Sequence, residues 1–95
     1  MLFVVLATDK PNSGNLRDAT RQAHLDYIET YRAKIKIGGP TVGIGDKSNG
    51  SMMVLEADTL DEAEAIAAAD PFAEADLFES MVVKPWKWLT GSLGP

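Results

Sequence analysis

The sequence predicts an α+β fold in which two helices cover one face of a four-stranded antiparallel sheet. The chain has 95 residues, which allows one domain with one modest core. Short apolar, β-prone runs alternate with stretches of helical periodicity, in the order strand, helix, strand, strand, helix, strand. No repeat or linker interrupts this order, so we expect residues 1–95 to form a single domain with a loose tail from about residue 91.

The first strand is expected over residues 2–7, which are rich in β-branched and aromatic residues and lead into the turn-forming segment 9–14. Both alternating faces of this run are apolar, which predicts a strand covered on both sides. A helix should follow, with Asn15 as its N-cap and an apolar stripe at spacings of three and four residues. The stripe consists of Leu16, Ala19, Ala23, Tyr27 and Tyr31.

The middle of the chain should form a hairpin. Residues 34–44 are expected to lead into a strand, and Gly38-Gly39-Pro40 should produce a bulge or sharp bend, because these residues do not fit a regular central strand. The segment 46–50 is the expected hairpin turn, with Asn49-Gly50 as its strongest signal. The returning strand is then expected over residues 51–56.

The second helix begins at a capping box in which Thr59 is the expected N-cap and Glu62 the third helical residue. It should end at Asp70, because Pro71 disfavours helical geometry in the residue before it. Residues 72–77 have room for one further turn of helix.

The last strand is expected over residues 78–89, and it is apolar on both faces. The complete order is the ferredoxin-like split βαβ pattern (βαββαβ), which places both helices on one face of the sheet. The other face would be left bare and apolar, so we expect a homodimer that packs sheet against sheet. Trp86 and Trp88 share a face of this strand and should pack in the core or in the dimer interface.

Composition and missing motifs exclude several functions. A formal net charge of −5 argues against binding along a nucleic-acid backbone, and no apolar run is long enough to span a membrane. The apolar start of the chain lacks a basic lead, so we expect a cytoplasmic protein. With no cysteine, one histidine and no phosphate-binding or dinucleotide-binding glycine motif, we expect neither a metal nor a cofactor.

The remaining chemistry centres on the single histidine, His24. Histidine changes its charge near neutral pH, and as a general base it needs an orienting partner, usually a carboxylate. The two helices should pack side by side, which would bring Asp70 near His24. Arg17 and Arg21 lie on the same shoulder of the first helix and would add positive charge to hold a carboxylate or a developing oxyanion.

Each of these residues also has a structural interpretation. A histidine on a helix border is often a hydrogen-bonded surface or interface residue, and an Asp before a Pro commonly just ends a helix. The two arginines would then pair with nearby acids such as Asp18, with little effect on stability.

The sequence resembles the YciI-like (YCII-related) family over nearly its whole length. The motifs that carry the likeness are, in chain order, Asp9 and Pro11 after the first strand, R-x-x-x-R-x-x-H-L at residues 17–25, Gly39-Pro40, Gly50-Ser51, Asp70-Pro71-Phe72 and Val83-Lys84-Pro85-Trp86. No single motif is specific, but the ordered set at this spacing is.

The resemblance implies a ferredoxin-like fold that dimerises into an α/β barrel, with an active site built on a His–Asp pair. By position, the pair is His24 and Asp70. The residues around the pocket are Arg17, Arg21, Gly39, Pro40 and Ser51. Enzymes that the family resembles include a dehydrochlorinase of aromatic degradation, and related isomerase and monooxygenase barrels act on small cyclic compounds.

Our leading hypothesis is a small, cofactor-free enzyme that performs isomerisation or elimination on a small acidic or phenolic compound. His24 would shuttle the proton, Asp70 would orient it, and Arg21, together with Arg17, would hold the negative charge. The alternative is a non-catalytic module that binds a small ligand or another protein with the same pocket.

Overall fold

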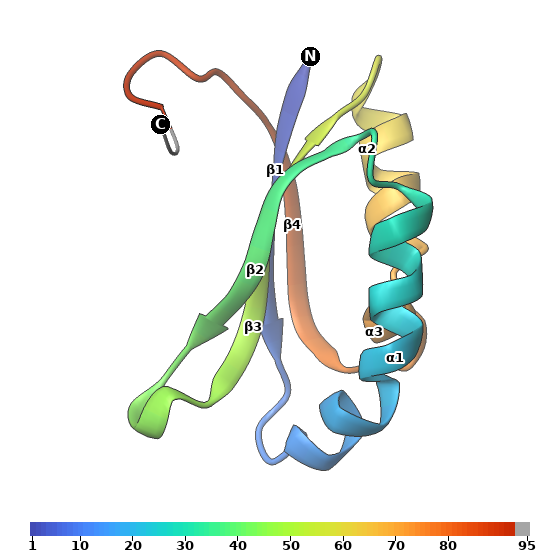
Figure 1. Ribbon diagram of the computed structural model, residues 1–95, viewed down its shortest axis with the longest axis vertical. Helices are drawn as coiled ribbons and strands as arrows, with labels where there is room; N and C mark the ends of the chain where they lie inside the picture. The colour runs from blue at the N-terminus through green and yellow to red at the C-terminus, as the bar shows by residue number, and fades with distance from the viewer. Residues whose placement is uncertain (93–95) are drawn as a thin grey trace.

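The computed structural model describes residues 1–92, and Figure 1 shows the sheet nearly edge-on with the helices on one side of it. The elements are β1 (Leu2–Asp9), α1 (Gly14–Thr30), β2 (Ile35–Val42), the 3-10 turn η1 (Ile44–Asp46), β3 (Ser48–Glu56), α2 (Leu60–Ala68), α3 (Pro71–Glu74) and β4 (Phe78–Trp86). The four strands form one antiparallel sheet in the order β2-β3-β1-β4. The ferredoxin-like α+β fold predicted from the sequence is therefore confirmed.

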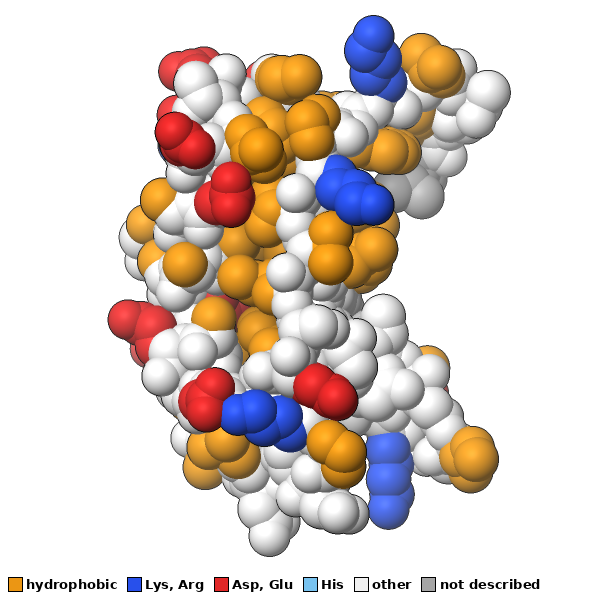
Figure 2. Space-filling view, turned by 180° about the vertical axis from the view of Figure 1, so that it is seen from behind, with side chains coloured by type: hydrophobic (Ala, Val, Ile, Leu, Met, Phe, Trp, Pro, Cys, Tyr) orange, Lys and Arg blue, Asp and Glu red, His pale blue; other side chains and the backbone are white. Residues whose placement is uncertain are grey.

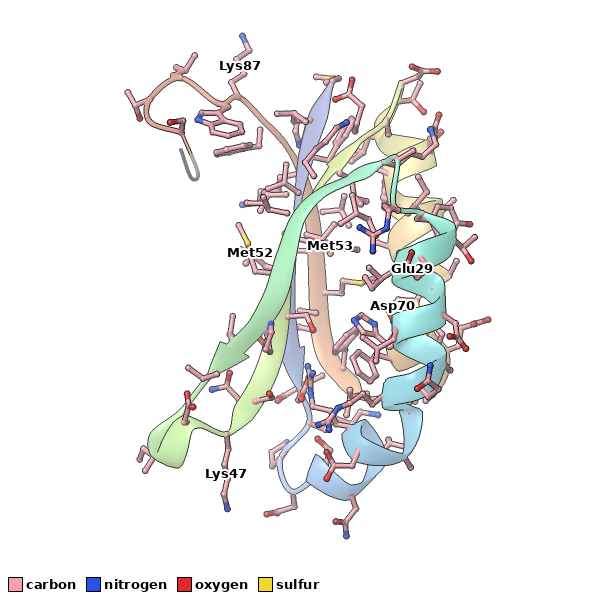
Figure 3. All side chains as sticks on the ribbon, viewed as in Figure 1. Glu29, Lys47, Met52, Met53, Asp70 and Lys87 are labelled. Atoms are coloured by element: carbon pink, nitrogen blue, oxygen red, sulfur yellow. The ribbon has the colours of Figure 1, made fainter. Side chains whose placement is uncertain are left out.

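The core lies between the sheet and the helices. Successive side chains of a strand point to opposite faces, and β1 accordingly buries Phe3, Val5 and Ala7 toward the helices. Figure 3 shows the same alternation in β3, where Met53 points toward the helices and Met52 points away. The main buried cluster is Phe3, Val5, Tyr27, Met53, Leu55, Ala57, Ala63, Ile66 and Ala67.

The opposite face of the sheet, which we call the open face, carries several exposed apolar side chains, and no helix covers it within residues 1–92. The strand register places Leu6 beside Met52 on β3 and Val82 on β4. Leu6 and Val82 are 48% and 43% exposed. The β2–β3 hairpin and the segment after β4 both extend away from the helices on this side in Figure 1. Figure 2 shows an outline that is hollowed on the same side.

Helix α1 turns a different face to the sheet than its apolar stripe predicts. Ala19 and Ala23 are exposed and Leu16 is 38% exposed, whereas Arg17 and Tyr27 are the buried residues of the helix. The spacing of apolar residues predicts the wrong buried face because Arg17 forms hydrogen bonds with polar groups inside the molecule. The helix also begins at Gly14, so Ser13 and not Asn15 stands at the N-cap position, without a side-chain capping hydrogen bond.

The hairpin turn lies earlier than the Asn49-Gly50 signal predicts. It runs through η1, where Gly45 and Asp46 adopt left-handed backbone angles, and the Gly43 N–H donates to the Lys47 carbonyl at 2.8 Å. Gly50 lies within β3, where a Cβ atom would stand 2.3 Å from the Ala7 carbonyl oxygen. This glycine therefore permits a close approach of two strands and does not form the turn.

The Gly38-Gly39-Pro40 segment pairs regularly with β3, so the bend predicted there is wrong. The register shifts lie on either side of it, between Ile35 and Ile37 and between Thr41 and Val42. Proline is tolerated because β2 is an edge strand, on which a missing N–H need not break a ladder.

The second half of the fold follows the prediction more closely. The Thr59 hydroxyl accepts from the Glu62 N–H at 3.1 Å, as a capping residue should. Helix α2 ends at Ala68, and α3 supplies the further turn of helix. Strand β4 ends at Trp86, three residues before the predicted end. Residues 93–95 of the predicted loose tail lie outside the described residues. Within residues 1–92, no helix is long and apolar enough to cross a membrane.

Candidate functional site

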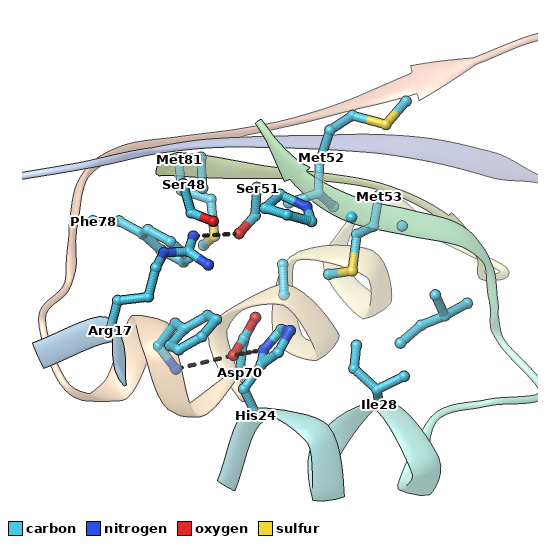
Figure 4. A pocket seen from close by; sticks show the side chains of 18 of the residues that line it. Arg17, His24, Ile28, Ser48, Ser51, Met52, Met53, Asp70, Phe78 and Met81 are labelled. Carbon is cyan, nitrogen blue, oxygen red and sulfur yellow. Dashed lines mark hydrogen bonds and ion pairs between the residues drawn. The ribbon is translucent and has the colours of Figure 1, made fainter. Parts of the chain in front are cut away.

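A cavity of about 430 Å³ lies between the helix-facing side of the sheet and helices α1 and α3. Figure 4 shows Met53 pointing into it and Met52 pointing away. Its walls are mostly apolar, and its polar side chains come from α1, β3 and the segment before α3. The polar and charged lining residues are Arg17, Arg21, His24, Ser48, Ser51 and Asp70.

The structure joins His24 and Asp70 by a hydrogen bond between Nδ1 and Oδ1 at 2.8 Å (Figure 4). The Asp70 side chain is 5% exposed and that of His24 is 20% exposed. An ionised carboxylate only accepts hydrogen bonds, so this bond places a proton on Nδ1, and in the neutral imidazole the lone pair is then on Nε2. His24 is also one of the residues that line the cavity.

Asp70 is held by the start of α3 as well as by His24. It is the N-cap residue of this short helix, and its Oδ1 accepts from the Phe72 N–H at 2.9 Å. Pro71 occupies the first position of the helix, where its fixed φ fits and no N–H is needed. The Asp-Pro-Phe sequence therefore fixes the carboxylate before any ligand binds.

Aromatic rings pack around His24. The imidazole stacks on the ring of Phe72 with centroids 4.1 Å apart and an angle of 15°. Tyr27 lies next to it at 6.1 Å, and its hydroxyl donates to the Ile66 carbonyl at 2.6 Å. Burial, and to a lesser extent the negative charge of Asp70, raise the pKa of Tyr27 well above its ordinary value. Tyr27 therefore keeps its proton and fixes α1 to α2.

Arg17 lies at one end of the cavity in a buried network. Its Nε donates to Asp9 Oδ2 at 2.7 Å, and its Nη2 donates to the Gly50 carbonyl at 2.7 Å and to Ser51 Oγ at 3.1 Å. The side chains of Arg17 and Asp9 are 9% and 6% exposed. The pair ties the end of β1 to α1 and β3.

The remaining predicted site residues also line the cavity. Arg21 reaches it from α1, but its side chain is 60% exposed and pairs with Asp18 at 2.8 Å. Gly39 and Pro40 contribute the wall on β2. The structure thus brings all seven predicted site residues to one cavity, and their catalytic and binding roles stay a prediction.

Three residues were not identified from the sequence: the polar lining residue Ser48, and Asp9 and Phe72, which contact the predicted site residues. Asp9 ends an apolar strand, where its position alone suggested a turn, and its partner Arg17 is eight residues away in another element. Phe72 follows Asp-Pro and was assigned only to a helical turn. A signal for Asp9 existed in its charge, because a carboxylate directly after a buried strand needs a partner.

The comparisons with known proteins point to one family. The model of the YCII-related domain matches residues 1–87. The protein YciI of Escherichia coli is 32% identical in a match that covers 92% of this chain and 97% of YciI. An uncharacterized protein of Haemophilus influenzae matches with the same identity and coverage.

Solved structures extend this comparison. The 5-chloro-2-hydroxyhydroquinone dehydrochlorinase TftG of Burkholderia phenoliruptrix, solved with 2,5-dihydroxybenzoquinone, is 39% identical, with a TM-score of 0.86 over 92% of this chain and 94% of TftG. A protein of unknown function from Nitrosomonas europaea is 16% identical with a TM-score of 0.57, over 99% of this chain and 93% of its own. At this identity the second likeness concerns the fold alone.

Proposed function

We propose that this chain, which belongs to the YCII-related domain family, is a small enzyme that moves a proton on an acidic or phenolic ring compound. The observation that carries the proposal is the hydrogen bond from His24 to the buried Asp70 inside a preformed cavity. The similarity to TftG, which removes chloride from a hydroxylated ring, supports the same class of chemistry. The proposal includes the cytoplasmic location and the single domain expected from the sequence.

The reaction begins when His24 Nε2 takes a proton from the substrate. Asp70 stabilises the imidazolium that forms and keeps the ring in place. In an elimination, the electron pair of the bond to the abstracted proton forms a new π bond. The bond to the leaving group then breaks, and the leaving group departs as an anion with that bond's electron pair. In an isomerisation, the imidazolium returns the proton to a different atom of the same molecule.

The charges around the cavity fit a substrate with modest negative charge. Arg21 is exposed and paired only through the weak surface contact with Asp18, so it is available to hold a substrate oxygen. Apolar side chains such as Met53, Met81 and Ile28 cover much of the remaining wall. A flat ring with one or two acidic oxygens matches this combination.

The enzyme would work as a homodimer that packs open face against open face. Leu6, Met52 and Val82 form an apolar row across three strands on this face. A row of this kind is rarely left in water on a monomer. A two-fold interface would cover it in both chains at once.

The test is turnover of a substrate panel by the wild-type protein and by His24→Ala. The panel contains 5-chloro-2-hydroxyhydroquinone, followed by chloride release, and several lactones, followed by absorbance. We expect turnover of at least one compound and a loss of about 100-fold or more in His24→Ala, the usual range for a general base.

Asp26→Asn is the matched control for Asp70→Asn, because Asp26 lies on the exposed side of the same helix as His24 and pairs with Gln22. The control should keep wild-type turnover, whereas Asp70→Asn should lose most of it. Turnover that survives His24→Ala unchanged would contradict the role of His24. Saturable binding of the panel without any conversion would favour the alternative, a module that only binds.

A further inference from the structure

The two arginines of the cavity have opposite surroundings. Arg17 is buried and bonded to Asp9, Gly50 and Ser51, whereas Arg21 is largely exposed and, within residues 1–92, forms a hydrogen bond only with the surface carboxylate of Asp18. A buried guanidinium with a buried carboxylate beside it has little net charge left to offer a substrate anion. The two side chains therefore have different tasks, although they lie one helical turn apart.

Arg17 also contacts the ring that supports His24. Its guanidinium carbon lies 4.6 Å from the centroid of Phe72, over the face of the ring. The His24 imidazole stacks on a face of the same ring at 4.1 Å. Arg17 and His24 are seven residues apart on α1, which corresponds to two turns and about 10 Å along the helix axis. The Phe72 ring therefore contacts both the Arg17 guanidinium and the His24 imidazole.

Phe72 links this stack to Asp70 as well, since its backbone N–H donates to the oxygen that binds His24. A displacement of Phe72 would shift both partners of the pair together. The guanidinium that lies over Phe72 is itself held by two hydrogen bonds to Asp9.

We propose that Asp9 and Arg17 are positioning residues: the pair fixes the guanidinium against Phe72, and Phe72 sets the place of the His24–Asp70 pair. This inference rests on the proposed function of His24 as the base. Under this inference, Arg21 binds the substrate anion and Arg17 does not. Ser51 belongs to the same device, because its hydroxyl accepts from Arg17 and is held in one place at the cavity wall.

The variant Asp9→Asn separates positioning from anion binding, because the two roles predict opposite effects. If Arg17 held a substrate anion, removing the Asp9 charge would leave a freer cation and tighter binding. If Arg17 positions Phe72, the loss of Asp9 loosens the guanidinium, and binding weakens. The probe is 2,5-dihydroxybenzoquinone, an acidic flat ring, with affinity measured by titration calorimetry.

We expect Asp9→Asn to bind the probe about tenfold more weakly, because the cavity is then less well preorganised for the ring. The ¹H and ¹⁵N signals of the His24 imidazole should move in the folded variant without any ligand. Asp18→Asn is the matched control, since it removes the carboxylate partner of Arg21. It should leave the His24 signals in place and bind the probe equally or slightly more tightly.

Arg17→Lys tests the same link if Asp9→Asn does not fold. Lysine keeps the charge but cannot form the two-pronged contact or lie flat on Phe72, so the His24 signals should again move. Wild-type His24 signals in either folded variant, or tighter binding of the probe by Asp9→Asn, would overturn the proposal. The imidazole signals can be measured without turnover. If only the proposed reaction fails, the His24 signals still shift in these variants. If the positioning proposal fails, they stay at their wild-type values.

Discussion

The two faces of the sheet differ in what covers them. The face toward the helices carries a closed core and a polar site whose buried groups are paired, and within the described residues no buried side-chain nitrogen or oxygen lacks a hydrogen-bond partner. The open face carries apolar side chains at 39–48% exposure, Leu6, Val82 and Trp86 among them. Both faces are formed by the same strands, because successive residues point to opposite faces and many residues on each face are apolar.

The difference shows how a chain of this size combines a site with a small core. Its helices cover one face, and there polar groups can be desolvated and paired, as His24 and Asp70 are. The other face carries little polar chemistry, and its apolar rows fit a contact with a second chain.

The covered face should be far more sensitive to truncation than the open face. Phe3→Ala removes a side chain that is 0% exposed, and we expect a loss of about 3–5 kcal/mol in the free energy of unfolding. Leu6→Ala should cost clearly less at low protein concentration, since this side chain is half exposed in one protomer. Urea denaturation of both variants measures the gap. The gap should narrow at high concentration, where a second chain would bury Leu6.

A charge on the open face should separate the proposed homodimer. Leu6→Arg places a cation in the middle of the apolar row, and its burial without a partner would cost more than the contact provides. Sedimentation velocity should show a monomer for this variant and a dimer for the wild type. Ala65→Arg, on the exposed side of α2, is the control and should remain dimeric. A dimer that persists in Leu6→Arg would place the interface elsewhere.

Asp70→Asn should weaken the polar site within the covered face. The change removes a charge-assisted hydrogen bond to His24, and we expect a loss of about 1.5–3 kcal/mol in the free energy of unfolding. The amide oxygen can still accept from Phe72, so α3 should persist. Thermal and urea denaturation give the loss, and NMR gives the protonated ring nitrogen of His24. An unchanged free energy of unfolding in this variant would argue against the charge of Asp70 as a stabilising partner of His24.

Tyr27 should make stability fall at alkaline pH. Unfolded Tyr27 ionises near its ordinary value of 10.0, whereas burial raises the folded pKa above it. The stabilisation is therefore complete below pH 10 and is lost as pH rises from there toward the folded pKa.

Tyr27→Phe provides the comparison, because it cannot ionise. It should lose about 1 kcal/mol at pH 8, through the missing bond to the Ile66 carbonyl, and should show a shallower decline between pH 9 and 11. Urea denaturation at several pH values measures both slopes. Parallel slopes for the two proteins would mean that other groups cause the alkaline loss.

Much of the fold was predictable because its signals are local. The apolar run of β1, the capping box at Thr59 and the Asp70-Pro71 stop each depend on residues within one turn or one strand. The predictions that failed depend on pairing across elements. Asn49-Gly50 has the composition of a turn, but Gly50 is required by the approach of Ala7, and the left-handed angles are supplied by Gly45 and Asp46 instead.

The site shows the same limit. The residue types of a proton-transfer pair are visible in the sequence, because the single histidine lies in the first predicted helix and an Asp-Pro ends the second. The partner of Arg17 was not, since arginine on a helix normally pairs with a nearby acid, as Arg21 does with Asp18. Phe72 was hidden for a similar reason, because an aromatic residue in a short helix is usually core.

By itself the sequence determined the order of the elements, the two apolar faces of the sheet and the few groups that can transfer a proton. These follow from periodicity, capping and composition, which act over a few residues. The tertiary structure decided which side of α1 faces the sheet, which arginine is buried and which ring supports His24. Those choices depend on desolvation, because burying a guanidinium is costly unless a hydrogen-bonded carboxylate is buried beside it. For Arg17 on α1 this carboxylate is Asp9 at the end of β1.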